Sequence, residues 1–138
     1  MGQVLRLNEN EVIEAVCSYL GVKGYKILQK CATTDKGVDV IAENVASSKL
    51  LLIEAKGGTS TRSGSSRFGK DYNASQVRHQ VAHGIYTAIC SGDKNKKRAL
   101  AFPDCPVFRK YLNPTKEALQ KLEIVVFLVQ PDLSVIEY

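Results

Sequence analysis

The feature that most constrains this chain is a run of four large aliphatic residues, Leu50-Leu51-Leu52-Ile53, that leads directly into Glu54-Ala55-Lys56. A short uninterrupted aliphatic run is typical of a strand buried on both faces of a sheet. Because side chains alternate along a strand, Glu54 and Lys56 are expected on the same face. Charge at the rim of a core is costly unless it is paired or metal-bound, so this strand end is the first candidate site.

A second carboxylate lies a short distance upstream, in Gly37-Val38-Asp39-Val40-Ile41. This segment predicts a strand over residues 38–42 with Asp39 inside it. Asp35 is an alternative acidic residue, but it belongs to the polar turn at residues 33–37. Two carboxylates and a lysine on neighbouring strands are typical of a divalent-metal site that hydrolyses phosphodiesters.

Length and composition limit the classes of protein that fit. With 138 residues, 44% hydrophobic and 24% charged, the chain is expected to form one domain over residues 1–138. Its longest apolar runs are too short to span a membrane, and the N-terminus lacks the apolar core of a signal peptide. We therefore expect an intracellular, cytoplasmic protein with no membrane association. The four scattered cysteines include no Cys-x-x-Cys pair, which argues against zinc and disulfides.

The net charge of +5, with an isoelectric point near 9.0, is compatible with a polyanionic partner but does not identify one. Hydrophobic periodicity and turn residues predict an α/β domain with a mixed sheet flanked by helices. The expected helices cover residues 9–21, 75–90, 103–111 and 114–122. The expected strands cover residues 25–31, 38–42, 50–56, 97–102, 123–129 and 134–138, and a loop covers residues 57–73.

Together, these motifs resemble the PD-(D/E)xK nuclease superfamily, which has the restriction-endonuclease-like fold. The pattern is Asp39, fourteen intervening residues, then Glu54-Ala55-Lys56. The α-β-β-β-α-β order of that core matches residues 9–102, and a C-terminal helix plus two strands follow. The segment around Asp39 is similar to the Mrr-like and archaeal Holliday-junction-resolvase-like branches, although no proline precedes it. The resemblance implies an endonuclease that acts on DNA with Mg²⁺ or Mn²⁺, as a homodimer.

The resemblance also implies roles for individual residues. Asp39, Glu54 and the backbone carbonyl of Ala55 would hold the metal, since Mg²⁺ prefers oxygen ligands and keeps several waters. Lys56 would orient or help deprotonate the attacking water and neutralise charge in the transition state. Glu14, on the first helix, would reach the metal through water. The competing interpretations are a same-strand ion pair between Glu54 and Lys56 and a solvated Glu14.

Several polar residues are candidates for binding nucleic acid. They are two glutamines one turn apart on the second helix, basic residues of the long loop, and a basic run before the fourth strand: Gln76, Gln80, Arg62, Arg67, Lys70, Lys96 and Lys97. The alternatives are an exposed polar stripe, a plain solvent loop and a solvated charge run. His79 and His83 have a spacing that can bind metal, but without a third ligand we interpret them as surface histidines.

Other function classes stay open. The chain could be a catalytically silent nucleic-acid-binding or assembly module of the same fold, although retention of Asp39, Glu54 and Lys56 argues against this. It could also be a toxin or effector nuclease that cuts RNA, because a phosphate-directed metal site does not reveal the sugar. The last alternative is an unrelated α/β domain with a chance Glu-x-Lys.

Overall fold

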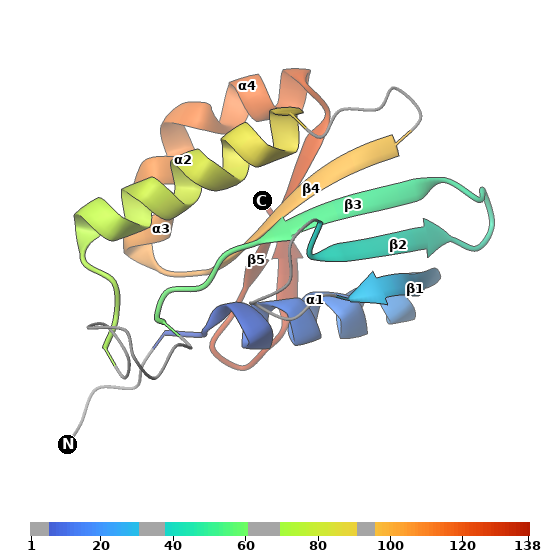
Figure 1. The fold of residues 1–138 in the computed structure, drawn as a ribbon, viewed down its shortest axis with the longest axis horizontal. Helices are drawn as coiled ribbons and strands as arrows, with labels where there is room; N and C mark the ends of the chain where they lie inside the picture. The colour runs from blue at the N-terminus through green and yellow to red at the C-terminus, as the bar shows by residue number, and fades with distance from the viewer. Residues whose placement is uncertain (1–5, 31–37, 61–69, 91–95) are drawn as a thin grey trace.

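The computed structural model describes residues 6–30, 38–60, 70–90 and 96–138. Within these ranges the helices and strands follow the predicted order closely (Figure 1). The elements are α1 (Glu9–Val22), β1 (Tyr25–Lys30), β2 (Val40–Asn44), β3 (Leu50–Ala55), α2 (Ala74–Cys90), β4 (Lys96–Pro103), α3 (Pro106–Leu112), a 3₁₀ turn (Asn113–Thr115), α4 (Lys116–Lys121), β5 (Ile124–Val129) and β6 (Val135–Glu137).

The six strands form one mixed sheet in the order β1-β2-β3-β4-β5-β6. The first three strands form an antiparallel meander, as predicted from their short connections. Strands β3, β4 and β5 are parallel, and β6 returns antiparallel beside β5. Parallel neighbours require a long crossover, and α2 supplies the one between β3 and β4. The chain is therefore an α/β domain with a mixed sheet.

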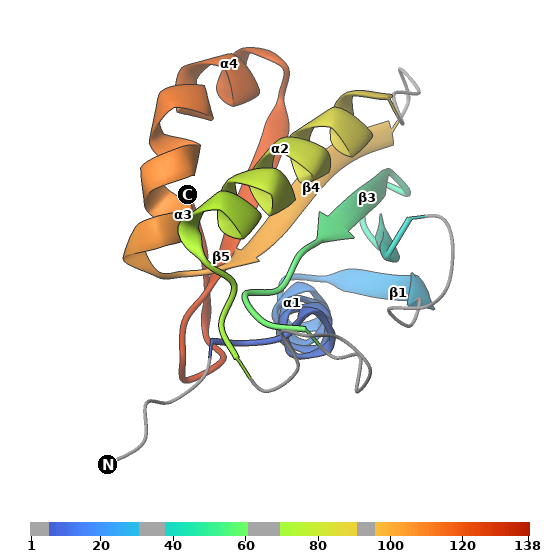
Figure 2. The same ribbon diagram turned by 60° about the vertical axis from the view of Figure 1, so that its left-hand side comes forward.

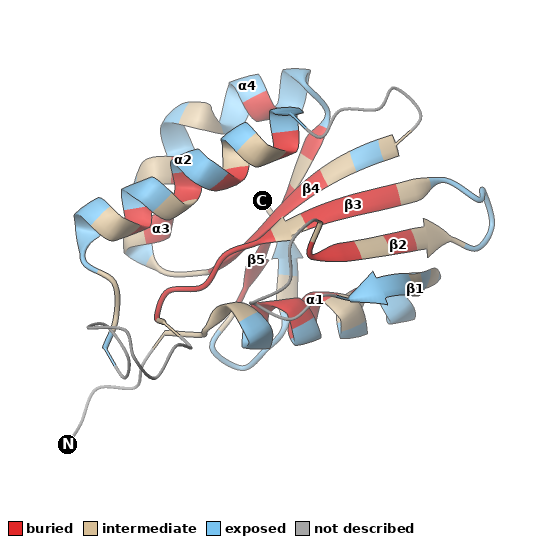
Figure 3. Cartoon of the chain, in the orientation of Figure 1, coloured by how far each residue is buried: buried red, intermediate tan, exposed pale blue. Residues whose placement is uncertain are grey.

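Helices cover both faces of this sheet, as two views of the ribbon show (Figures 1 and 2). On one face α1 packs its buried residues, such as Val12 and Val16, against a cluster that includes Val40 and Ile53. On the other face α2, α3 and α4 pack against the alternate strand residues, including Phe102. The central strands β3, β4 and β5 carry most of the buried strand positions (Figure 3), which confirms that residues 51–53 are buried. None of the helices in the described ranges is both long and apolar enough to cross a bilayer.

Element boundaries depart from the sequence-based expectations by one to three residues in several places; β3, for example, ends at Ala55 rather than at Lys56. Strand β2 begins at Val40, so the prediction that Asp39 lies inside the strand is wrong: Asp39 directly precedes it. Helix α1 continues through Gly21 to Val22, because Gly21 takes a helical conformation and the positive φ needed to end the helix is supplied by Gly24 (φ 92°). The segment after α3 begins with a 3₁₀ turn around Pro114 before α4 starts. The predicted capping box at Asn8 is confirmed, with reciprocal bonds to Glu11.

Candidate functional site

The β2–β3 register brings the two candidate carboxylates to facing positions. Val40 pairs with Ile53 in the antiparallel ladder, so the next residues outward, Asp39 and Glu54, lie opposite each other. Val40 and Ile53 both pack into the α1 side of the sheet. Because side chains alternate along a strand, Glu54 and Lys56 project on the α2 side. The local sequence thus places an acid on each of two adjacent strand ends and the lysine two residues further on.

Asp39 is buried, with 7% of its surface exposed. Its Oδ2 atom accepts a hydrogen bond from the backbone amide of Ala55 at 2.8 Å, which fixes the carboxylate against the end of β3. Burial raises the pKa of Asp39, while the Ala55 amide and the charge of Lys56 oppose the rise. The ionised carboxylate is therefore less favourable here than in water.

Glu54 is in a similar environment. Burial is the main cause that raises the pKa of its carboxyl group, and repulsion from Asp39 raises it further. Lys56 opposes both effects, with its Nζ atom 3.4 Å from Glu54 Oε1. Lys56 is itself 8% exposed. One buried ammonium group thus serves the buried Asp39 and the partly buried Glu54, which leaves a net negative charge among these three side chains when both acids are ionised.

His83 is exposed, as expected for a surface histidine, but it also joins this group through a contact that the sequence analysis missed. Its Nδ1 atom lies 2.9 Å from Lys56 Nζ. The charge of Lys56 is the main cause that lowers the pKa of His83, followed by burial and by His79, whose ring stacks on it at 6.2 Å. A neutral imidazole can accept a hydrogen bond from the Lys56 ammonium group at Nδ1 only if Nε2 carries the ring hydrogen. The sequence feature that could have indicated this contact is the position of His83 on α2, the helix that connects β3 to β4.

The donor set is suited to a hard divalent cation rather than to zinc. Asp39 and Glu54 offer oxygen atoms from adjacent strand ends, and Mg²⁺ is commonly held by one or two carboxylates with water completing its shell. Across the described ranges, no three His, Cys, Asp or Glu side chains gather around one point. A closed all-protein cage is thus absent from that part of the chain. The two carboxylates fit an open, water-completed site.

The backbone after Lys56 is held by contacts with the start of α1. Lys56 donates its amide hydrogen to the Ala101 carbonyl, and the Gly58 amide donates to the Leu7 carbonyl at 2.8 Å. A β-carbon on Gly57 would lie 2.3 Å from the Glu9 nitrogen, so only glycine fits this approach. These contacts fix the direction in which the chain leaves the site.

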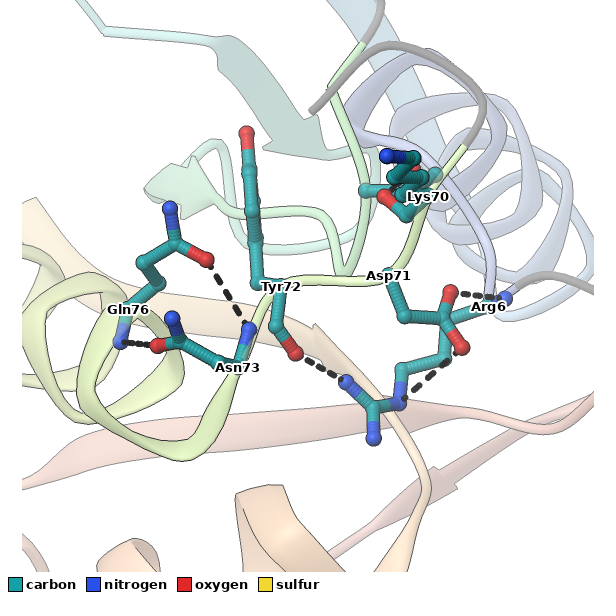
Figure 4. Close-up of polar contacts among 7 residues, drawn as sticks. Arg6, Lys70, Asp71, Tyr72, Asn73 and Gln76 are labelled. Carbon is teal, nitrogen blue, oxygen red and sulfur yellow. Dashed lines mark hydrogen bonds and ion pairs between the residues drawn. The ribbon is translucent and has the colours of Figure 1, made fainter. Parts of the chain in front are cut away.

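Arg6 binds the residues that lead into α2, Asp71 and Tyr72 (Figure 4). Its amide donates to Asp71 Oδ1 and its guanidinium to the Tyr72 carbonyl, both at 2.8 Å. Thr59 bridges to Asp71 and bonds the Lys70 carbonyl. The two ends of the segment between β3 and α2 are therefore tied together beside the candidate site. These links join residues far apart in sequence, and the sequence analysis did not anticipate them.

Three helix residues proposed from the sequence have specific surroundings. Glu14 bonds Lys30 at 2.6 Å on the exposed side of α1, across the sheet from α2. Gln76 forms reciprocal bonds with Asn73 at the start of α2, which gives it a capping role (Figure 4). Gln80 is half-buried one turn further along. Glu14 as a metal ligand and both glutamines as nucleic-acid contacts stay predictions.

The candidate basic residues that the structure describes lie at two separate places along the sheet. Arg62 and Arg67 lie outside the described residues. The exposed Lys70 directly precedes Asp71, the residue that Arg6 binds (Figure 4). Lys96 and Lys97 pair in register with Leu50 and Leu51, which lie before Glu54 on β3. At 3.3 Å per residue, this places them roughly 10–13 Å from Glu54 along the sheet, so a ligand that contacts both regions must extend along the sheet.

Comparisons with known proteins are sparse. No family model matches the chain, and no curated protein matches it. Among solved structures, the fold is similar to an FdxN element excision controlling factor protein from Anabaena variabilis. The TM-score is 0.49 at 16% sequence identity, over 92% of this chain and 96% of that one. At this level of similarity we draw no inference about family or activity.

Proposed function

We propose that this chain is a nuclease that hydrolyses phosphodiester bonds in DNA with Mg²⁺ or Mn²⁺, built on a restriction-endonuclease-like core. The observation that carries the proposal is the convergence of Asp39, Glu54 and Lys56 at one buried strand end. The element order α-β-β-β-α-β and the antiparallel pairing of the two motif strands agree with that core. Function as a homodimer is part of the same proposal.

The energetics of the site favour an added cation. Burial raises the pKa of both Asp39 and Glu54, so their ionised forms lower the stability of the folded protein. A divalent cation would remove that penalty, and the two carboxylates would hold it. Such a metal supplies an acidified water and polarises the phosphoryl oxygens.

Lys56 and His83 would act on the substrate side of the reaction. The Lys56 ammonium group has three hydrogens, and two have partners in Glu54 and His83. The third can be donated to the attacking water or to a phosphate oxygen, where positive charge stabilises the transition state. His83 holds the lysine by accepting one hydrogen, so we assign it the role of a positioning residue.

Cleavage of a mixed substrate panel tests the proposal. The panel contains duplex, junction, flap and single-stranded DNA together with RNA, each with Mg²⁺, Mn²⁺ or EDTA. We expect metal-dependent cleavage of DNA that falls by at least about 100-fold in Asp39→Asn and Glu54→Gln. Glu43→Gln is the matched control, because Glu43 lies on the same face at the other end of β2.

The outcomes separate the alternatives. Cleavage that persists in EDTA, or in both carboxamide variants, would overturn the assignment of the metal site. Cleavage of RNA alone would replace the DNA substrate with RNA. Salt-sensitive nucleic-acid binding without cleavage under any condition would favour the silent binding module of the same fold.

A further inference from the structure

A cleft of about 540 Å³ adjoins the candidate site on the α2 side of the sheet. Its lining includes Glu54 and His83, and it extends from them between the C-terminal half of α2 and strands β3 and β4. The other residues that matter here are Val38, Leu52 and Tyr86. The cleft is therefore continuous with the carboxylates and is not a separate cavity.

Beyond Glu54 and His83, the wall residues that the structure describes are largely apolar, and none of these described residues is cationic. Tyr86 is 68% exposed, so its ring is open to a ligand at the edge of the cleft. Tyr86 lies three residues after His83 on α2, so the two side chains share one helix face. An aromatic ring thus stands one turn away from the residue that holds Lys56.

We propose that this cleft receives a nucleobase of the nucleotide next to the phosphate that is cut, with Tyr86 as its stacking platform. The inference rests on the proposed function. A phosphate is a poor occupant of the cleft itself, because no cationic residue is found among the described residues that line it. A base is uncharged and has two apolar faces, and aromatic side chains stack on bases regardless of sequence. A nucleotide whose phosphate lies at Glu54 carries its base into the adjacent cleft.

This occupancy sets the substrate class. A base stacked within a duplex cannot enter a cleft beside the phosphate unless it leaves the stack, which costs free energy. An unpaired nucleotide does not pay that cost. We therefore infer a substrate with an unpaired nucleotide at the cut site, in a single strand, a flap or a bulge, in preference to intact duplex.

Binding without cleavage provides the first test. The full chain in EDTA is titrated into duplex DNA with a one-nucleotide bulge that is 2-aminopurine, and into the same duplex with an abasic bulge. We expect the base-containing bulge to bind about 10-fold more tightly and its fluorescence to change on binding. Tyr86→Ala should remove most of that preference, a loss consistent with one base–aromatic stack, whereas Tyr86→Phe should keep it. Ile89→Ala is the matched control, being 46% exposed on the same helix but outside the cleft lining.

Cleavage with Mg²⁺ on the same two bulges separates this inference from the proposed function. Base-dependent binding without any cleavage would leave the cleft assignment standing and overturn the nuclease. Cleavage that is equal on both bulges and unchanged in Tyr86→Ala would overturn the cleft assignment and leave the nuclease standing. Equal binding of both bulges, or an equal loss on both in Tyr86→Ala, would overturn the nucleobase site. Self-association that Tyr86→Ala abolishes, without base-dependent binding, would assign the cleft to a second copy of the chain instead.

Discussion

Replacing Lys56 by methionine tests whether charge imbalance defines the candidate site. Methionine keeps an unbranched apolar stem of similar length but removes the ammonium group. Lys56 is 8% exposed, and Glu54, 3.4 Å away, has a side chain that is 13% exposed. The substitution therefore leaves Glu54 and Asp39 buried with no lysine to offset their charge.

The expected loss follows from this burial. Removing one partner of a buried ion pair costs about 3–5 kcal/mol, and since some water reaches both groups, we expect the lower end, about 3 kcal/mol at pH 8. For a domain of this size 1 kcal/mol changes the unfolding temperature by about 4 °C, so the midpoint should fall by about 12 °C.

The loss should depend on pH, with a sign fixed by the direction of the pKa shifts. Burial raises the pKa of Asp39 and Glu54 above their ordinary values of 3.8 and 4.5, and Lys56 opposes the rise. A carboxyl with a raised pKa destabilises the folded state above that pKa, and the penalty disappears as the pH falls through it toward the unfolded value. In Lys56→Met both pKa values rise further, so the loss should be full at pH 8 and smaller at pH 5.

Thermal unfolding of parent and Lys56→Met at pH 8 and pH 5, without divalent metal, measures this. Lys30→Met is the matched control: Lys30 is 2.6 Å from Glu14, closer than Lys56 is to Glu54, but exposed. Exposed pairs contribute little, so Lys30→Met should change the midpoint hardly at all. Equal losses at both pH values in Lys56→Met would show that it removed packing rather than charge, and would refute the reasoning.

Three further predictions concern the surroundings of the site. Gly57→Ala should destabilise the fold by about 3 kcal/mol, because the new β-carbon would overlap the backbone at the start of α1. The control Gly21→Ala has open space around its β-carbon and should stabilise the fold by about 0.5–1 kcal/mol. Equal unfolding midpoints of the two variants in calorimetry would contradict the close approach at Gly57. His83→Ala should lower kcat for DNA cleavage about 10-fold with KM unchanged, and His83→Asn should recover part of it; a change in KM alone would argue against positioning. Phe102→Ala should cost about 3–5 kcal/mol in urea unfolding, because Phe102 is fully buried against Phe108, and a loss under 1 kcal/mol would contradict that packing.

Local patterns were sufficient to predict most helices and strands. The aliphatic run at residues 50–53 identified β3 because only a doubly covered strand needs four consecutive apolar side chains. The Asn8 and Glu11 pair identified the start of α1 because capping depends on neighbours in sequence. The same patterns indicated Asp39, Glu54 and Lys56, which the fold brings to one strand end.

Contacts between distant residues were not predictable in this way. The bond between Lys56 and His83 depends on how α2 crosses back over the sheet. The bonds from Arg6 to Asp71 and Tyr72 join positions 65 and 66 residues apart, and no local pattern encodes them. The start of β2 was placed too early, because Val38 extends the apolar pattern to the other side of Asp39 although the strand begins at Val40.

A second acidic group in the same protein shows how a purely structural ion pair differs from the candidate site. Asp104 accepts two bonds from Arg109, at 2.6 and 2.9 Å, and one from Gln130. Hydrogen bonding from Arg109 is the main cause that lowers the pKa of Asp104, so this pair stabilises its ionised acid.

At β3 the relation is reversed. Two acids share one lysine, and burial raises the pKa of both Asp39 and Glu54 despite it. An ion pair that served only the fold would gain from balanced charge, as at Asp104. Buried carboxyl groups whose ionised form lowers the stability of the fold are typical of sites that act on a ligand. A cation bound between Asp39 and Glu54 would offset this loss of stability.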